Sequence, residues 1–350
     1  MSRYKIYVGS YTAKSADQFG AGKGIYVCRF DGKDTIIPVW VSTDCMDPSF
    51  LLVKGDMLYA VEETRESTLL AYKILNSQLK KAASLPLQQK DTCHIQMTSD
   101  EKYISTANYG SGSLSLAALM PDGLFGALAC TFVHHGSSVH PRQTAPRVHS
   151  TQNSPDGKYL LAADLGTDKI TVYFRTEEGR LIEEPKMGVQ VPAGRGPRHM
   201  AFSPDGARLF VVCEISSTLL IYPYDAHSGV GELLEERNLV PQGGGESSKA
   251  ADIHFSPDGR HLYISVRGPD TIVMAPYFDG VLGNIKVFPA YGKSPRNFCI
   301  TPDGKYLITA NELPGNIAVM PRDAETGVLG RCTAAADIPR AVYVTAVMEG

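Results

Sequence analysis

Residues 141–168 read PRQTAPRVHSTQNSPDGKYLLAADLGTD and contain both the turn that decides the fold and the polar residues that suggest a site. Within them, residues 154–161 (SPDGKYLL) form a Ser-Pro-Asp-Gly turn followed by an apolar strand. Proline fixes φ and glycine accepts a positive φ, so this turn leads one strand into the next. The stretch therefore predicts a β-hairpin, and residues 146–149 (PRVH) place a cation and an imidazole at its start.

Close copies of this hairpin recur along the chain. Each copy has a short apolar strand, a turn of the Ser-Pro-Asp-Gly kind, and a second apolar strand that ends at a polar residue. Internal similarity at a period of roughly 40–50 residues is typical of propellers and solenoids. The second strands of the six complete copies are expected near residues 58–63, 103–108, 159–164, 209–214, 262–267 and 306–311.

A seventh copy is split between the ends of the chain. Residues 338–344 supply a first strand with no turn after it, and residues 5–11 supply a second strand with no first strand before it. Placing both in one blade closes a ring and removes the open sheet edges that a linear stack would expose.

Each unit continues with a weaker hairpin, such as residues 170–174 with 178–181, or 317–320 with 326–329. Helical periodicity over 11–18 residues is almost absent, so an α/β fold is excluded. Four strands in each of seven units predict an all-β chain. We expect one domain over residues 1–350, a seven-bladed β-propeller of four-stranded antiparallel blades whose N- and C-terminal strands share a blade.

The composition limits the possible partners and the compartment. With 20% charged residues, a net charge of -3 and a pI near 6.3, nothing marks the chain for nucleic acid or an anionic membrane. Seven scattered cysteines without a CxxC pair indicate a reducing compartment. We expect a cytoplasmic protein, with export through a removed leader left open. The oligomeric state stays open between a monomer and a weak dimer.

The repeats also predict where polar side chains converge. In a closed ring, the starts of the inner strands and the ends of the second strands are expected to lie at the same rim of the central channel. The starts supply Arg147, His149, Arg198, His199, Arg296 and Arg340, and the ends supply Glu62 or Glu63, Asn108, Asp164, Glu214, Arg267, and Asn311 with Glu312.

This set suits an anionic small molecule, because arginine forms bidentate bonds to carboxylate or phosphate, and a carboxylate or neutral imidazole can act as a general base. A structural alternative stands beside it. Each arginine can instead pair with a carboxylate of the next blade and lock the ring, and His149 alone can be a hydrogen-bonded structural residue.

Other polar residues are expected to be structural. Asp156, Asp205, Asp258 and Asp303 lie in the turns, so we interpret them as turn residues and not as catalytic acids. The insertion at residues 133–145 carries His134, His135 and His140 without a matching carboxylate spacing, so the chain is expected to hold no metal there. A second insertion, residues 241–250, is rich in glycine and serine, and such loops often frame a site.

Beyond the repeat, several segments resemble the seven-bladed propeller lactonases, the 6-phosphogluconolactonase type that also includes fungal carboxy-muconate lactonising enzymes. The resemblance covers essentially the whole chain. It depends on residues 7–12 (YVGSYT), 107–113 (ANYGSGS), Arg142-Gln143 with His149, 164–168 (DLGTD), 196–199 (GPRH), 262–268 (LYISVRG), and Pro295-Arg296 with 310–312 (ANE).

The resemblance implies a site at the channel mouth, with catalytic positions at His149, Glu214, Arg198 and Arg267. Substrate binding is expected from Arg142, Gln143, Arg147, His199, Arg296 and Asn311. Two positions depart from the family pattern. Arg147 stands where the family usually has histidine, and Val266 stands where it usually has asparagine.

What the resemblance implies is a lactonase that converts 6-phosphogluconolactone to 6-phosphogluconate in the pentose phosphate pathway, without metal or other cofactor. Glu214 or His149 would deprotonate the water, Arg198 and Arg267 would stabilise the oxyanion, and Arg147 and Arg296 would hold the phosphate. Two alternatives remain open. One is a muconate-type lactonising enzyme or another sugar lactonase, and the other is a non-catalytic propeller that binds a ligand or a protein.

Overall fold

The computed structural model describes residues 3–13, 21–240 and 247–349, and within them all regular structure is β-strand, β1 to β31. The glycine-rich stretch 241–246 of the predicted insertion lies outside the described residues. The chain divides into two compact units. Unit 1 comprises Met1–Ala60, Tyr72–Lys80 and Gly244–Gly350, and unit 2 comprises Val61–Ala71 and Lys81–Gly243.

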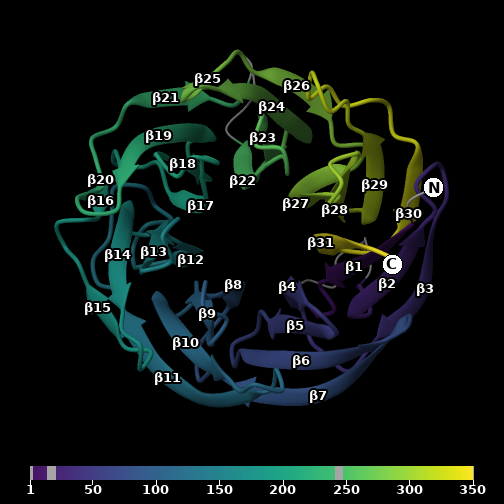
Figure 1. The fold of residues 1–350 in the computed structure, drawn as a ribbon, viewed down its shortest axis with the longest axis horizontal. Coiled ribbons are helices and arrows are strands. Elements are labelled where there is room, and N and C mark those ends of the chain that lie inside the picture. The colour runs from purple at the N-terminus through teal and green to yellow at the C-terminus, as the bar shows by residue number, and fades with distance from the viewer. Residues whose placement is uncertain (1–2, 14–20, 241–246, 350) are drawn as a thin grey trace. The chain divides into compact units, whose positions relative to one another are not determined.

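Unit 1 contains three complete antiparallel sheets (Figure 1). Two are built from strands that follow one another in the chain, and the third joins β31 to the first three strands. Their strands are β1 (Tyr4–Ser10), β2 (Ile25–Phe30), β3 (Ile36–Ser42) and β31 (Ala341–Met348); β22 (Lys249–Phe255), β23 (His261–Arg267), β24 (Thr271–Phe278), β25 (Val281–Leu282) and β26 (Lys286–Pro289); and β27 (Lys293–Ile300), β28 (Tyr306–Leu313), β29 (Asn316–Pro321) and β30 (Ala334–Asp337).

Unit 2 also contains three complete antiparallel sheets (Figure 1). They are formed by β8 (Thr92–Met97), β9 (Tyr103–Asn108), β10 (Ser113–Leu119) and β11 (Phe125–Val133); β12 (Val148–Asn153), β13 (Tyr159–Asp164), β14 (Lys169–Arg175), β15 (Leu181–Glu183) and β16 (Val189–Gln190); and β17 (Pro197–Phe202), β18 (Arg208–Cys213), β19 (Thr218–Asp225), β20 (Gly229–Val230) and β21 (Glu235–Asn238).

The seventh sheet has the order β4-β5-β6-β7, and the boundary between the two units crosses it. Its strands are β4 (Pro48–Lys54), β5 (Met57–Glu62), β6 (Thr68–Leu75) and β7 (Gln78–Pro86). In three of the other sheets, two short strands share the outermost position, as β15 and β16 do beside β14. Among the described residues, no helix is long and apolar enough to cross a membrane.

The Ser-Pro-Asp-Gly turns join the inner two strands of a sheet, as the sequence predicts. In the turn after β12, Ser154 Oγ donates to Asp156 Oδ1 at 2.6 Å, and Gly157 has φ 72°. The same hydroxyl-to-carboxylate bond occurs at Asp205, Asp258 and Asp303, where Ser203, Ser256 and Thr301 are the donors. These aspartates therefore act as turn residues, because their carboxylates fix the backbone of the turn.

The chain ends meet in one sheet, which confirms the split seventh unit. β31 pairs antiparallel with β1, from Tyr4 opposite Met348 to Ser10 opposite Ala341. One expected strand was placed wrongly. The fourth strand after β29 is β30 (Ala334–Asp337), and residues 326–329 form a turn with an isolated bridge between Arg322 and Leu329. Asp323 and Gly327 hydrogen-bond across this turn at 2.9 Å, so the chain reverses before it can pair with β29.

The inner strands are buried on both faces, which is why they read as continuous apolar runs. In β13, Leu160 and Ala162 pack into one core cluster, and Leu161 and Ala163 pack into another. Side chains alternate along a strand, so each second strand contributes to the core on either side of its sheet. Burial of this kind supplies most of the driving force for folding.

Asp258 offers a test of the turns within unit 1. Its carboxylate accepts from Arg322 Nη2 at 3.1 Å, and the Arg322 side chain is only 1% exposed. Asp258→Asn should lower the free energy of unfolding by about 2 kcal/mol more than Asp156→Asn does, because it leaves a buried cation without its carboxylate. Asp156 is the matched control, since its turn has the same hydroxyl bond but its cation is the exposed Lys158.

Urea denaturation at pH 7 measures this difference. Hydrogen bonds and the Arg322 charge outweigh partial burial and hold the pKa of Asp258 well below its ordinary value. The stabilisation is therefore complete above the unfolded pKa of about 4 and shrinks as the pH falls below it. Equal losses in the two variants at pH 7 would contradict the assignment.

Candidate active site

Bulges in the inner strands of unit 2 aim three side chains out of the regular ladder. In β17, Pro197 pairs with Cys213 and His199 pairs with Val212, so Arg198 is an extra residue. β12 has the same shift between Val148 and Ser150, which leaves His149 as the extra residue, and β8 has it at Cys93. A bulge bends the strand and re-aims its unpaired side chain. His149, Arg198 and Cys93 are thus equivalent positions in three neighbouring repeats.

This register corrects one sequence-based expectation. The Pro-Arg pairs were expected to begin equivalent inner strands, but Pro146-Arg147 precedes β12, whereas Pro197-Arg198 lies within β17. Arg147 is therefore equivalent to Gly196, the residue before β17, and not to Arg198. The sequence alone could not reveal this, because a bulge adds a residue to one strand without changing the apolar pattern.

Glu214 is the centre of the candidate site. It follows the last residue of β18, and its backbone N–H donates to Gly196 O at 2.8 Å. Arg142 Nη2 donates to Oε1 at 2.5 Å, and Arg198 Nε donates to Oε2 at 3.0 Å. Glu214 is 4% exposed and Arg198 is 2% exposed. A buried guanidinium requires a carboxylate partner, so Glu214 holds Arg198 in place as well as facing the site.

Arg142 reaches Glu214 from the insertion at residues 133–145. The buried Gln143 fixes this loop: its Nε2 donates to Leu165 O at 2.8 Å, and its Oε1 accepts from His140 N at 3.0 Å. The Arg142 side chain remains 38% exposed. Burial works against its charged form, but the Glu214 carboxylate and the Tyr109 phenol outweigh it and raise the pKa of Arg142 above its ordinary value.

His149 lies on the other side of Glu214. Its Nε2 is 4.0 Å from Glu214 Oε2, which is too long for a direct hydrogen bond. Its ring meets His199 edge to face, with centroids 5.4 Å apart, and it meets Tyr109 in the same way at 5.5 Å. Cys93 Sγ lies 3.7 Å from His149 Nδ1. The imidazole is thus held by neighbours on several sides and is 4% exposed.

The structure adds residues that the sequence reasoning did not select. Tyr109 and Cys93 both touch His149, and the His94 ring lies 5.4 Å from the His199 ring. A signal for two of them existed in the repeat. Cys93 occupies the bulge position of His149, and Tyr109 follows β9 as Glu214 follows β18.

Three predicted residues belong to unit 1. Arg267 ends β23 opposite Lys249, and Arg296 is the bulge residue of β27, with its guanidinium carbon 5.5 Å from the centre of the Tyr11 ring. Asn311 is fully buried, and its Nδ2 donates to Ala290 O at 3.1 Å and to Thr309 Oγ1 at 3.1 Å. These contacts tie β28 to the segment between β26 and β27, so they give Asn311 a structural role.

The histidines of the insertion have other roles. His134 Nδ1 is 2.8 Å from Asp164 Oδ2, and its Nε2 is 2.7 Å from the Tyr173 hydroxyl. Both ring nitrogens are therefore engaged within unit 2, beside a cavity of about 330 Å³. In the part of the chain that the structure describes, no three His, Cys, Asp or Glu side chains are grouped to hold a metal ion.

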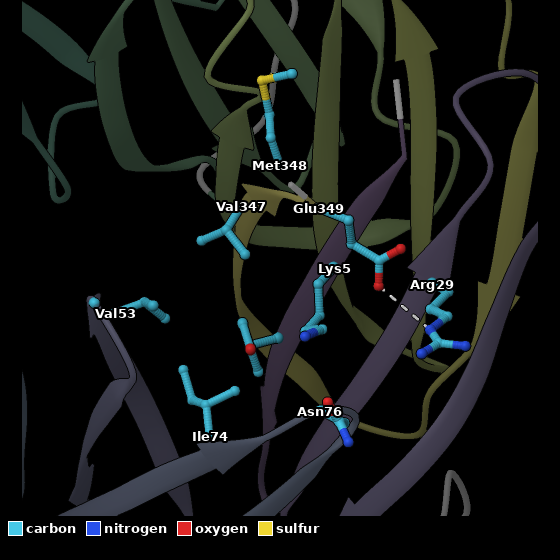
Figure 2. A pocket seen from close by; sticks show the side chains of 10 residues that line it. Lys5, Arg29, Val53, Ile74, Asn76, Val347, Met348 and Glu349 are labelled. Atoms are coloured by element: carbon cyan, nitrogen blue, oxygen red, sulfur yellow. Dashed lines mark ion pairs between the residues drawn. The ribbon is translucent and has the colours of Figure 1, made fainter. Parts of the chain in front are cut away.

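A second cavity, of about 690 Å³, lies in unit 1 (Figure 2). Lys5, Tyr7, Arg29 and Glu349 line part of it, and Arg29 Nε is 3.3 Å from Glu349 Oε1. Burial and the Glu349 carboxylate raise the pKa of Tyr7 to about 12. None of the predicted site residues lines this cavity.

Known proteins are similar to this sequence over nearly its whole length. Residues 5–346 match the family described as lactonase, 7-bladed beta-propeller. The chain belongs to this lactonase family. The family fold and the seven antiparallel sheets together confirm the predicted all-β, seven-bladed propeller.

Individual relatives of this lactonase are named for related activities. A 6-phosphogluconolactonase of Bacillus subtilis is 28% identical over 359 residues, covering 98% of either chain. One of Formosa agariphila is 32% identical over 344 residues, covering 93% of this chain and 94% of the other. The solved periplasmic gluconolactonase of Pseudomonas aeruginosa is 27% identical, has a TM-score of 0.91 and is covered over 99% of both chains.

Removing Glu214 should destabilise the lactonase as well as disturb its site. Glu214→Ala should cost about 3 kcal/mol in the free energy of unfolding, because Arg198 then remains buried without a carboxylate. Arg142→Ala should cost less than about 1 kcal/mol, because Arg142 is partly exposed and Glu214 keeps Arg198. Urea denaturation of both variants gives these values, and equal losses would show that Arg198 does not depend on Glu214.

Proposed function

We propose that this lactonase hydrolyses 6-phosphogluconolactone to 6-phosphogluconate, a step of the pentose phosphate pathway. The observation that carries the proposal is the charge of the unit 2 cluster. Arg142 and Arg198 share one carboxylate, Glu214, and the Arg147 guanidinium lies over the Tyr109 ring with no carboxylate partner among the described residues. Two guanidiniums on one carboxylate and a third guanidinium without one leave positive charge for an anionic substrate, and guanidinium matches phosphate in geometry. The two relatives named 6-phosphogluconolactonase support the same substrate.

Hydrolysis of a lactone needs a base for the attacking water. The 4.0 Å gap between His149 Nε2 and Glu214 Oε2 suits one water molecule donating to both, at about 2.8 Å from each. Both Glu214 oxygens already accept from guanidiniums. We therefore propose that His149 takes the proton from water and that Glu214 orients that water. A positioned base of this kind contributes roughly 10²–10⁴-fold in rate.

The rest of the reaction needs charge stabilisation and a proton for the leaving oxygen. Water adds to the lactone carbonyl carbon, and the negative charge of the tetrahedral intermediate falls on the former carbonyl oxygen. When the bond from that carbon to the ring oxygen breaks, the protonated His149 returns its proton to the ring oxygen. We assign oxyanion stabilisation to Arg142, which is partly exposed beside Glu214, with Arg198 holding Glu214.

The proposal needs no metal or other cofactor, because the guanidiniums carry the electrostatic role. We also propose a cytoplasmic location. The seven cysteines are all free thiols, and their scattered positions suit a reducing compartment.

The first test is hydrolysis of freshly generated 6-phosphogluconolactone above its spontaneous rate. Wild type should accelerate it, and His149→Gln should lower kcat by about 10²-fold or more, because it removes the base. His227→Gln is the matched control, since the His227 side chain in the same unit is 96% exposed.

The alternative activities make different predictions in the same assay. Cyclisation of a muconate-type diacid by wild type, without lactone hydrolysis, would shift the assignment to a lactonising enzyme. If the protein is an enzyme and not a binding propeller, His149→Gln should lose turnover while its melting temperature stays unchanged. Full activity of His149→Gln would remove His149 from the mechanism.

A further inference from the structure

Tyr109 occupies the same place in its repeat as Glu214 does in its own. Thr92 pairs with Asn108 at the end of β9, just as Pro197 pairs with Cys213 at the end of β18. The next residue then donates its N–H to the carbonyl before the inner strand: Tyr109 to Asp91 O at 3.1 Å, and Glu214 to Gly196 O at 2.8 Å. The fold therefore presents the Tyr109 side chain at the level of the candidate site.

Two glycines fix the turn after Tyr109, and Gly112 brings it against the segment that carries Arg147. Gly112 has φ 62°, and a Cβ there would come within 2.8 Å of Pro146 Cβ and of Pro146 O. A Cβ at Gly110 would meet Asp91 Oδ2 at 2.5 Å. Only glycine fits these positions without displacing its neighbours. The close approach brings the carbonyls of Tyr109 and Gly110 to the Arg147 side chain.

Arg147 is held by this turn on one edge only. Its Nη1 lies 3.5 Å from Tyr109 O and 3.4 Å from Gly110 O, and its guanidinium carbon lies 5.3 Å from the centre of the Tyr109 ring. Within the described residues, its Nε and Nη2 make no hydrogen bond, and no carboxylate pairs with it. Arg142 and Arg198, by contrast, share Glu214. The Nε and Nη2 edge of a guanidinium can donate two parallel hydrogen bonds to two oxygens of a phosphate.

The same tyrosine ring also contacts the candidate base. The His149 ring meets it edge to face, with centroids 5.5 Å apart and an angle of 78° between the planes. One rigid aromatic side chain thus touches the anion-binding cation and the imidazole. It sets the separation between the two groups.

We propose that Tyr109 is a specificity-determining residue. By supporting Arg147 at a fixed separation from His149, it makes the site prefer lactones that carry a phosphate over the same lactones without one. This inference rests on the proposed function and identifies what selects its substrate. It differs from that function because hydrolysis itself does not require Arg147.

The test compares the kcat/KM for 6-phosphogluconolactone with that for gluconolactone. Tyr109→Leu should lower this ratio about fivefold, because it removes the aromatic face that supports the cation. Tyr109→Phe should keep the ratio within about twofold, because the ring remains. Arg147→Gln should lower the ratio by about 10-fold or more, since it removes the charged bidentate group.

The double variant Tyr109→Leu/Arg147→Gln distinguishes support of Arg147 from an independent effect. If Tyr109 acts through Arg147, the ratio of the double variant should equal that of Arg147→Gln alone. A further fivefold loss in the double variant, or an unchanged ratio in Tyr109→Leu, would overturn the inference. If Tyr109→Leu does not fold, an unchanged ratio in Arg147→Gln overturns it equally.

A binding measurement separates this inference from the proposed activity. By isothermal titration, 6-phosphogluconate should bind Tyr109→Leu about fivefold more weakly than wild type, and gluconate should show no such change. This pattern without hydrolysis of either lactone would refute the proposed reaction and keep the phosphate site. Equal affinity of wild type and Tyr109→Leu for 6-phosphogluconate would refute the role of Tyr109 whatever the activity.

Discussion

The inner hairpins β12–β13 and β17–β18 are each held at both ends by hydrogen bonds, and the rest of the site depends on this constraint. At one end, the Ser-Pro-Asp-Gly turn is closed by a backbone bond such as Ser154 N to Tyr159 O. At the other end, the residue after the second strand donates to the carbonyl before the first, as Leu165 does to Arg147. The first strand has one residue too many between these two fixed ends, so it bulges. The bulge is what turns His149 and Arg198 out of the ladder.

Burial then decides which of these polar side chains can act on a substrate. Arg198 is nearly inaccessible, so its charge is matched by Glu214 within the protein. Arg142 shares the same carboxylate from a partly exposed position, and among the described residues no carboxylate pairs with the Arg147 guanidinium. A graded set of cations results, from one that organises the site to one that is available to an anion. In the low-dielectric interior a guanidinium needs a carboxylate partner, whereas a solvent-exposed guanidinium does not.

Stability and the candidate site are therefore coupled at Glu214. Its carboxylate pairs with the buried Arg198 and lies 4.0 Å from His149, so its removal affects a buried cation and the candidate site together. His149 is different, because Glu214 keeps its ion pairs with Arg142 and Arg198 when His149 is replaced. Replacing Glu214 should therefore destabilise the fold more than replacing His149 does, because only Glu214 pairs with a buried cation.

The residue pattern was enough to predict the all-β fold, the repeated hairpin, the shared terminal sheet and the turn role of Asp156, Asp205, Asp258 and Asp303. These features depend on local chemistry, because proline, aspartate and glycine set a turn wherever they occur. It also selected His149, Arg198 and Glu214 as neighbours. Three features became visible only in the folded chain. They are the strand register that makes Arg147 and Arg198 non-equivalent, the hydrogen bond from Arg142 to Glu214, and the contacts of Tyr109. Bulges and loop conformations depend on hydrogen bonds between distant residues, and the apolar pattern of a strand does not record them.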